Sequence, residues 1–239
     1  MKLGTGIVAA GMGLALAGGI FWFMSSLNPA PAFAGVQSNA ANLLDVRHPV
    51  TADMLKDAQA KAGMELPPVE LLNSQGQKVN LASLPGKPIV VVMTKDGCPC
   101  NIESQPFFNQ IAKGFGDKVQ FYGIIDGDKD VAEEYRLDFK VPYPILLNLE
   151  EKVFRAFGAK QSVYTYLFDK NGKAVKVWPG YSAETMTELN DRLAELTASP
   201  APKLDLTMAS PELTSGCYFF RPIGWDPVKE QWQMRETGS

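Results

Sequence analysis

The chain has 239 residues, of which 46% are hydrophobic, so it is long enough for one domain of ordinary size with its own core and shorter appendages. It carries 23 basic and 26 acidic residues, giving a formal net charge of −3, and it contains no basic block. Nucleic-acid binding needs a concentrated basic surface, so this charge pattern excludes nucleic acid as a partner.

The N-terminal residues 1–27 predict a transmembrane anchor or a signal segment. Residues 3–24 contain no charged side chain, and a helix of this length spans a bilayer core of roughly 30 Å. Lys2 favours a cytoplasmic N-terminus. The alternative is a secretory signal cleaved after Ala34, because residues 32–34 (Ala-Phe-Ala) have the small-x-small pattern of a cleavage site. Both alternatives place the rest of the chain on the extracytoplasmic (periplasmic or lumenal) side of a membrane.

Residues 28–62 are predicted to form a linker that contains a short helix. Pro, Ala, Ser and Asn are frequent in the first part, and Thr51 is suited to cap a helix over residues 51–62. His48, the only histidine, lies between the two parts. Because a metal site needs several converging ligands, a lone linker histidine is expected to be solvated, and the sequence predicts no metal site and no cofactor.

Residues 63–197 have the pattern of an α/β domain, in which short apolar runs alternate with amphipathic stretches. The continuous β-branched run at residues 89–93 suits a central strand that is buried on both faces. We expect a central mixed sheet flanked by helices, with these elements in chain order: a hairpin (69–72 and 78–80), a strand (89–93), a helix (99–113), a strand (119–125), a helix (131–139), a strand (145–148), a helix (150–157), a hairpin (164–169 and 174–178) and a closing helix (182–196).

The helix at 99–113 is predicted to begin at Pro99, a residue type favoured at the first helical position. Its apolar side is expected to contain Ile102, Pro106, Phe107 and Ile111.

Residues 198–239 are predicted to form a C-terminal extension that is rich in aromatic residues. The run at 217–225 (Cys-Tyr-Phe-Phe-Arg-Pro-Ile-Gly-Trp) is too apolar to remain solvated. It is expected to pack on its own domain, on a partner or on the membrane surface, and the sequence does not choose among these.

The three cysteines carry the chemistry that the sequence predicts. An exported chain meets an oxidising compartment, and an odd number leaves at least one thiol outside any internal disulfide. Cys98 and Cys100 flank Pro99 at the start of a helix, where unpaired N–H groups and the helix dipole favour a thiolate. The preceding turn, which contains Thr94, Lys95 and Asp96, is expected to shape the site, with Lys95 adding a favourable positive charge.

At this point the sequence resembles the redoxin and peroxiredoxin-like (AhpC/TSA-type) branch of the thioredoxin superfamily, including membrane-anchored thiol-disulfide oxidoreductases. The resemblance covers residues 66–196 and rests on Leu-Pro-Pro-Val at 66–69, Gly-Lys-Pro at 86–88, Cys-Pro-Cys at 98–100, and Phe157-Gly158 through Asp-Lys-Asn-Gly at 169–172. It implies a thioredoxin-like fold and thiol-disulfide exchange with protein thiols or disulfides. In this reading Cys98 attacks and Cys100 resolves.

The sequence also departs from that family in three ways. One residue, rather than two, separates the cysteines of the motif. Val163 stands where the resemblance implies a cis-proline facing the active thiol. Lys95 and Gly97 occupy the two candidate positions of a peroxidase threonine, and no arginine lies near Val163 in the sequence, so a thiol peroxidase is the weaker alternative.

Two further alternatives stay open at this stage. One is a non-catalytic subunit or scaffold of a membrane complex, in which the glycine-rich anchor and the aromatic extension contact other subunits. The other concerns the disulfide partner: Cys217 is the alternative resolving thiol, because a flexible extension could fold back onto the motif at modest additional entropic cost.

Overall fold

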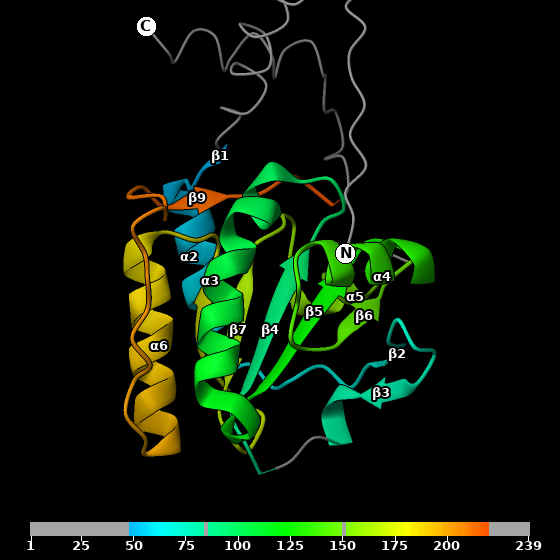
Figure 1. The fold of residues 1–239 in the computed structure, drawn as a ribbon, viewed down its shortest axis with the longest axis horizontal. Helices are drawn as coiled ribbons and strands as arrows, with labels where there is room; N and C mark the ends of the chain where they lie inside the picture. Colours follow the sequence, from blue (N-terminus) through cyan, green and yellow to red (C-terminus); the bar gives the residue numbers. More distant parts are fainter. Residues whose placement is uncertain (1–47, 84–85, 150–151, 220–239) are drawn as a thin grey trace, which may run out of the picture. The chain divides into compact units, whose positions relative to one another are not determined.

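The computed structural model describes residues 48–83, 86–149 and 152–219, and the fold is drawn in Figure 1. In chain order the elements are β1 (His48–Pro49), α2 (Ala52–Ala60), β2 (Glu70–Leu72), β3 (Lys78–Asn80), the 3-10 turn η1 (Leu81–Ser83), β4 (Ile89–Thr94), α3 (Pro99–Phe115), the 3-10 turn η2 (Gly116–Lys118), β5 (Gln120–Ile125), α4 (Lys129–Asp138), β6 (Ile145–Leu147), α5 (Lys152–Phe157), β7 (Thr165–Phe168), β8 (Ala174–Trp178), α6 (Ala183–Thr197) and β9 (Thr214–Ser215).

The main sheet has five strands in the order β6-β5-β4-β7-β8. Strands β4, β5 and β6 are parallel, whereas β7 is antiparallel to both β4 and β8. β4 lies in the middle and every one of its residues is buried, as the β-branched run predicts. The predicted mixed sheet flanked by helices is therefore confirmed.

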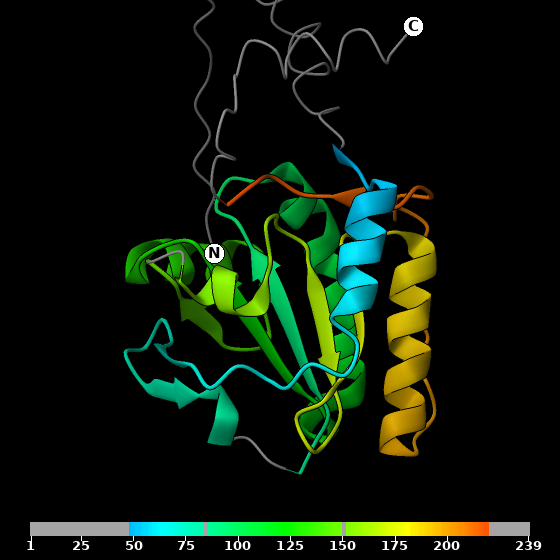
Figure 2. The same ribbon diagram turned by 180° about the vertical axis from the view of Figure 1, so that it is seen from behind.

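Alternate residues of β4 point into two separate hydrophobic cores, one on each face of the sheet. Val90 and Val92 join the core under α3, α4 and α6, and Val91 and Met93 join the core under α2 and α5. Figures 1 and 2 show these two helical layers from opposite sides. The strand that precedes the cysteine motif is consequently fixed from both faces.

α3 begins at Pro99 as predicted, but its buried side differs from the expected one. Ile102 is 42% exposed and Pro106 is also exposed, so the prediction that both face the core is wrong. Two buried polar side chains on α3, Gln105 and Asn109, take up the inner face instead. They are retained there by hydrogen bonds, which remove the cost of burying them.

The buried hydrogen bonds of α3 form a network with the neighbouring elements. Gln105 Nε2 donates to Asn109 Oδ1 (2.8 Å) and to Tyr143 Oη (2.7 Å), while Tyr135 Oη donates to Gln105 Oε1 (3.0 Å). Asn109 Nδ2 donates to the carbonyl of Phe139 (2.8 Å). The network joins α3 to α4 and to the segment before β6, and so fixes the helix that begins at the cysteine motif.

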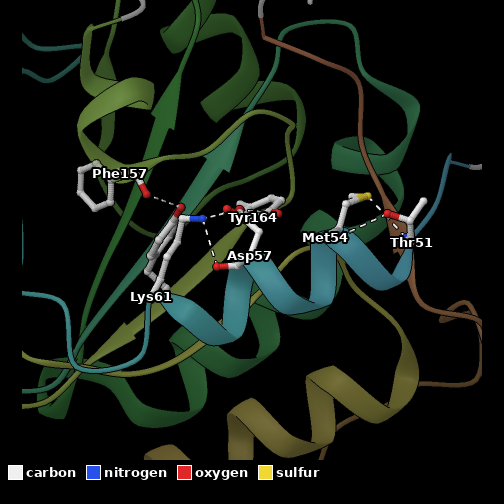
Figure 3. A network of polar contacts seen from close by, with 7 residues as sticks. Thr51, Met54, Asp57, Lys61, Phe157 and Tyr164 are labelled. Carbon is white, nitrogen blue, oxygen red and sulfur yellow. Dashed lines mark hydrogen bonds and ion pairs between the residues drawn. The ribbon is translucent and has the colours of Figure 1, made fainter.

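On the other face, α2 packs against β8, and its side chains reach the loop before β7 (Figure 3). Thr51 caps α2 by accepting from the backbone N–H of Met54 (3.3 Å), as the sequence predicts. Lys61 pairs with Asp57, and Asp57 also accepts from Tyr164 Oη (3.5 Å). Tyr164 is the residue directly before β7, so α2 helps to fix the loop that leads into this strand.

The chain after α6 packs back onto the domain. Gln110 on α3 exchanges hydrogen bonds with the backbone of Asp205, and Asn190 on α6 donates to the carbonyl of Pro202. β9 then pairs with β1, which puts His48 opposite Ser215. We call residues 213–219, which include β9, the tail strand.

The predicted anchor or signal segment at 1–27 and the alternative cleavage site after Ala34 lie outside the described residues, as does the extension beyond residue 219. In the ranges that the structure describes, no helix is long and apolar enough to cross a membrane.

Candidate functional site

The cysteine motif lies where β4 ends and α3 begins. After β4 the chain turns at Gly97, whose φ of 65° is a conformation that favours glycine. Cys98 is the N-cap of α3, with extended backbone angles, and Pro99 takes the first helical position. The predicted placement of Cys98 and Pro99 is therefore confirmed.

The surroundings of the Cys98 sulfur differ from those that the sequence predicts. Its side chain makes no capping hydrogen bond to the N–H groups of α3, and Cys98 is only 1% exposed. Its sulfur accepts instead from Ser162 Oγ (3.2 Å) and from the backbone N–H of Cys217 (3.3 Å). Two segments that are remote in the sequence, rather than the helix start alone, thus supply its hydrogen bonds.

The turn before Cys98 is fixed by Asp126 and Asn101. Asp126 accepts from Lys95 Nζ (2.6 Å) and from the backbone N–H of Asp96 (2.7 Å). Asn101 Oδ1 accepts from the backbone N–H of Lys95 (3.0 Å). Lys95 is paired with a carboxylate and so holds the turn, and a favourable effect of its charge on the Cys98 thiolate stays a prediction.

Thr94 lies at the end of β4, is buried and accepts the backbone N–H of Asp126 through its carbonyl (3.3 Å). It therefore joins the turn to the strand next to it. Asp96 is exposed, and only its backbone takes part in these contacts.

Val163 lies in the loop before β7 in an unusual conformation. Its φ is 61°, a region that costs energy for a β-branched residue. Its N–H donates to the carbonyl of Met93 (2.7 Å), and Met93 N–H donates to the carbonyl of Tyr164 (2.8 Å). Every peptide bond among the described residues is trans. Val163 thus ties the loop to β4 and leaves its neighbour Ser162 against Cys98.

The tail strand runs antiparallel to this same loop. Ser162 N–H donates to the carbonyl of Cys217 (2.9 Å), and Gly216 N–H donates to the carbonyl of Ser162 (3.1 Å). Phe219 N–H donates to the carbonyl of Lys160 (3.0 Å). Gly216 leaves no space for a side chain, because a Cβ there would lie 2.0 Å from Ser162 Oγ. This close approach brings the backbone of Cys217 directly over the Cys98 sulfur.

All three cysteines are free thiols, and they converge on Cys98. Cys98 and Cys100 are buried and Cys217 is half-buried. Hydrogen bonds from the thiols of Cys100 and Cys217, together with those from Ser162 and the Cys217 N–H, hold the pKa of Cys98 well below its usual range although burial opposes this. Donation to Cys98, reinforced by burial, raises the pKa values of Cys100 and Cys217.

His48 is not the solvated linker residue that the sequence predicts. Through β1 it lies beside the tail strand, where it is half-buried, with Nε2 3.9 Å from the Cys217 sulfur. Its backbone N–H lies within hydrogen-bonding reach of the Cys100 thiol. His48 and Cys217 are 169 positions apart in sequence and meet through the pairing of β1 with β9, so no local pattern signals this contact.

The site therefore contains Cys98, Cys100, Pro99 and the turn residues that the sequence predicts, together with four residues that it misses. These are Ser162, Asp126, Asn101 and His48. The ranges described by the structure include no group of three or more His, Cys, Asp or Glu residues placed to hold a metal ion. One stabilised thiolate with two thiols in reach is an arrangement suited to disulfide exchange.

Comparisons with known proteins agree with this geometry. A family model described as the AhpC/TSA family matches residues 62–177. The thiol-disulfide oxidoreductase ResA of Bacillus subtilis (strain 168) is 25% identical over 126 residues, which cover 52% of this chain and 70% of that protein. The H-type thioredoxin of Fagopyrum esculentum is 34% identical over 86 residues, which cover 36% of this chain and 72% of that protein.

Solved structures show the same fold. An uncharacterized conserved protein from Geobacillus kaustophilus superposes with a TM-score of 0.55 at 20% identity and covers 70% of this chain and 93% of that chain. The thioredoxin domain of a thiol-disulfide oxidoreductase from Bacteroides vulgatus superposes with a TM-score of 0.50 at 18% identity and covers 55% of this chain and 96% of that chain. This protein belongs to the redoxin branch of the thioredoxin superfamily.

Proposed function

We propose that this protein carries out thiol-disulfide exchange with protein thiols or disulfides, with Cys98 as the attacking thiolate. One observation carries the proposal: the Cys98 sulfur accepts hydrogen bonds from Ser162 and the Cys217 N–H while the thiols of Cys100 and Cys217 lie within reach. The names of relatives such as ResA support the same activity.

In the first step the Cys98 thiolate attacks one sulfur of a partner disulfide. A mixed disulfide forms between Cys98 and the partner, and the other partner sulfur leaves as a thiolate and takes up a proton. Cys100 then loses its proton and attacks the Cys98 sulfur, which releases the second partner thiol and leaves a Cys98–Cys100 disulfide. The protein gains one disulfide and the partner loses one, so the electrons balance.

The other predicted residues have positioning roles in this proposal. Pro99 sets the start of α3, and Thr94, Lys95 and Asp96 hold the turn through Asp126. Val163 orients the loop that carries Ser162. The raised pKa of Cys100 keeps it protonated until the mixed disulfide removes the negative charge from Cys98.

We further propose that the domain lies on the extracytoplasmic side of a membrane, attached by residues 3–24 or released by cleavage after Ala34. The anchor and the aromatic residues beyond 219 would then contact subunits of a membrane complex. A reporter fused to the C-terminus tests the topology, since activity of that reporter in the cytoplasm would contradict it.

The exchange activity is tested by following the oxidation of a synthetic dithiol peptide by the oxidised protein. We expect Cys98→Ser to reduce the rate to the uncatalysed background, because serine forms no disulfide. Ser104→Ala is the matched control: Ser104 is buried on the same helix, and its hydroxyl donates to the carbonyl of Asn101 rather than to a cysteine. If the wild-type protein oxidises the peptide no faster than the uncatalysed reaction, the result would instead favour the scaffold alternative.

A further inference from the structure

Cys217 is the thiol of the site that a partner can reach. Cys98 and Cys100 are 1% and 2% exposed, whereas Cys217 is half-buried. A partner reaches a sulfur with almost no exposed surface only after the structure opens, so the attack of Cys98 on a partner disulfide proposed above requires such an opening. The part of the site that is open to partners in the folded state is therefore the tail strand rather than the Cys-Pro-Cys motif.

The tail strand holds Cys217 by contacts on both sides. On one side β9 pairs with β1, and Thr214 exchanges backbone hydrogen bonds with Tyr181 (2.8 and 2.9 Å). On the other side, the strand pairs with the backbone of residues 160–162. Phe219 stacks on Phe154 with ring centroids 3.6 Å apart. These contacts fix the position of the Cys217 thiol, so the tail strand is not a loose extension.

We infer that Cys217 is a third redox-active thiol that forms a disulfide with Cys98, and that partner thiols attack this disulfide at Cys217. It forms from the Cys98–Cys100 disulfide that exchange with an oxidising disulfide leaves: Cys217 loses its proton and bonds to Cys98, and Cys100 leaves and is protonated. The inference rests on the proposed function and deepens it, because it identifies the sulfur that the partner meets and the class of substrate, a protein dithiol that becomes oxidised.

The chemistry of this disulfide follows from the unequal surroundings of its two sulfurs. A partner thiolate bonds to the Cys217 sulfur, the Cys98–Cys217 bond breaks, and Cys98 leaves as a thiolate. Ser162 Oγ and the Cys217 N–H are already placed to stabilise that thiolate. In disulfide exchange the better-stabilised thiolate is the better leaving group. Attack at the half-buried Cys217, rather than at the buried Cys98, is therefore favoured both by access and by the leaving group.

The reaction is completed by the second thiol of the partner. It loses its proton and attacks the partner sulfur of the mixed disulfide, and Cys217 leaves and is protonated. The partner dithiol has become a disulfide, and Cys98 and Cys217 have gained the two electrons. Cys100 connects the two couples of the site: its attack on Cys98 in the Cys98–Cys217 disulfide gives a Cys98–Cys100 disulfide and a free Cys217 with no net oxidation.

The experiment is peptide mapping of the full-length protein after oxidation with oxidised glutathione, acid quenching and alkylation. Trypsin separates residues 96–113, which contain Cys98 and Cys100, from residues 204–229, which contain Cys217. We expect these two peptides to be linked in the wild type, and also in Cys100→Ser, where Cys98 is the remaining cysteine of its peptide. Absence of the linked peptides from both proteins would overturn the inference.

A second measurement locates the partner. The oxidised Cys100→Ser protein is mixed with a synthetic monothiol peptide, and the adduct is expected on Cys217; an adduct on Cys98 would contradict the inference. In dithiol-peptide oxidation, Cys217→Ser is expected to lose about tenfold or more in rate. If Cys98→Ser falls to background while Cys217→Ser keeps the wild-type rate, the proposed function stands and this inference fails. If Cys98→Ser keeps the wild-type rate, the proposed function itself fails.

Discussion

The start of α3 and the tail strand both end at the Cys98 sulfur, but they reach it by different means. The start of α3 is built mainly from neighbours in sequence, with Gly97 turning the chain and Pro99 starting the helix, and Asp126 fixing the turn. The tail strand is held by backbone pairing with β1 and with residues 160–162. The first positions the sulfur and supplies the Cys100 thiol as a donor, and the second, with Ser162, provides the other hydrogen bonds that favour its charged form.

The contacts that position the Cys98 sulfur and the contacts that favour its charged form can therefore be changed separately. The buried network of α3 contributes to the stability of the fold but does not touch the sulfur. The tail contributes the hydrogen bond from the Cys217 N–H and the adjacent thiol. Changes in the two regions should therefore affect different measurements.

The largest expected effect is on stability, from Gln105→Ala on α3. Removing this side chain takes a hydrogen-bond partner from each of the buried hydroxyls of Tyr135 and Tyr143. A buried polar group without its partner costs roughly 1–3 kcal/mol. The free energy of unfolding should therefore fall by about 3 kcal/mol. Denaturant unfolding measures it, with Glu103→Ala on the exposed side of α3 as the control. The pKa of Cys98 should stay at its wild-type value, and a large change in it would break the separation.

Next in size is the effect of Gly216→Val on the Cys98 thiol. A side chain at this position collides with Ser162 and displaces the tail strand, so Cys98 loses the hydrogen bond from the Cys217 N–H. Hydrogen bonds to charged groups contribute about 1.5–3 kcal/mol each, so the pKa of Cys98 should rise by about 1–2 units. Its maximal alkylation rate should also rise, because the sulfur becomes accessible.

Tyr218→Ala is the control for this substitution, since the Tyr218 side chain is exposed while its backbone keeps the bridge to Gln161. If Gly216→Val leaves the pH dependence of Cys98 alkylation unchanged, the tail does not stabilise the thiolate.

Ser162→Ala is expected to have the smallest effect of the three. It removes the single hydroxyl donor at 3.2 Å and leaves the backbone pairing with the tail intact, so the pKa of Cys98 should rise by about 1 unit. The pH dependence of alkylation measures it, and Ser104→Ala should show no rise. A rise as large as that of Gly216→Val would mean that Ser162, rather than the tail, carries the effect.

The sequence predicts well the parts of the molecule that short-range patterns determine. The β-branched run predicts β4, the Asn171-Gly172 turn predicts the β7–β8 hairpin, and Cys98-Pro99 predicts the start of α3. The side chains of Ile102 and Pro106 are misplaced because α3 buries hydrogen-bonded polar residues, which a search for apolar residues at helical spacing does not find.

The contacts of the site are less predictable because they join distant segments. Ser162 and His48 reach the cysteines through pairings that no local spacing signals. Val163 can be singled out as a departure from the family, but its positive φ follows from ties to β4 that the sequence does not display. The sequence does indicate Cys217 as an alternative partner of the motif, because an extension can fold back at modest entropic cost.

The most direct test of the account is the pH dependence of Cys98 alkylation in the reduced wild-type protein, with the modified cysteine assigned by peptide fragmentation. Because its pKa is lowered, Cys98 remains a thiolate as the pH falls, so its rate should stay at the plateau through neutral pH and reach half of that plateau below about pH 7. Cys217, whose pKa is raised, should reach its half-maximal rate above the ordinary thiol value of about 8.5. A Cys98 midpoint at or above about 8.5 would contradict the account.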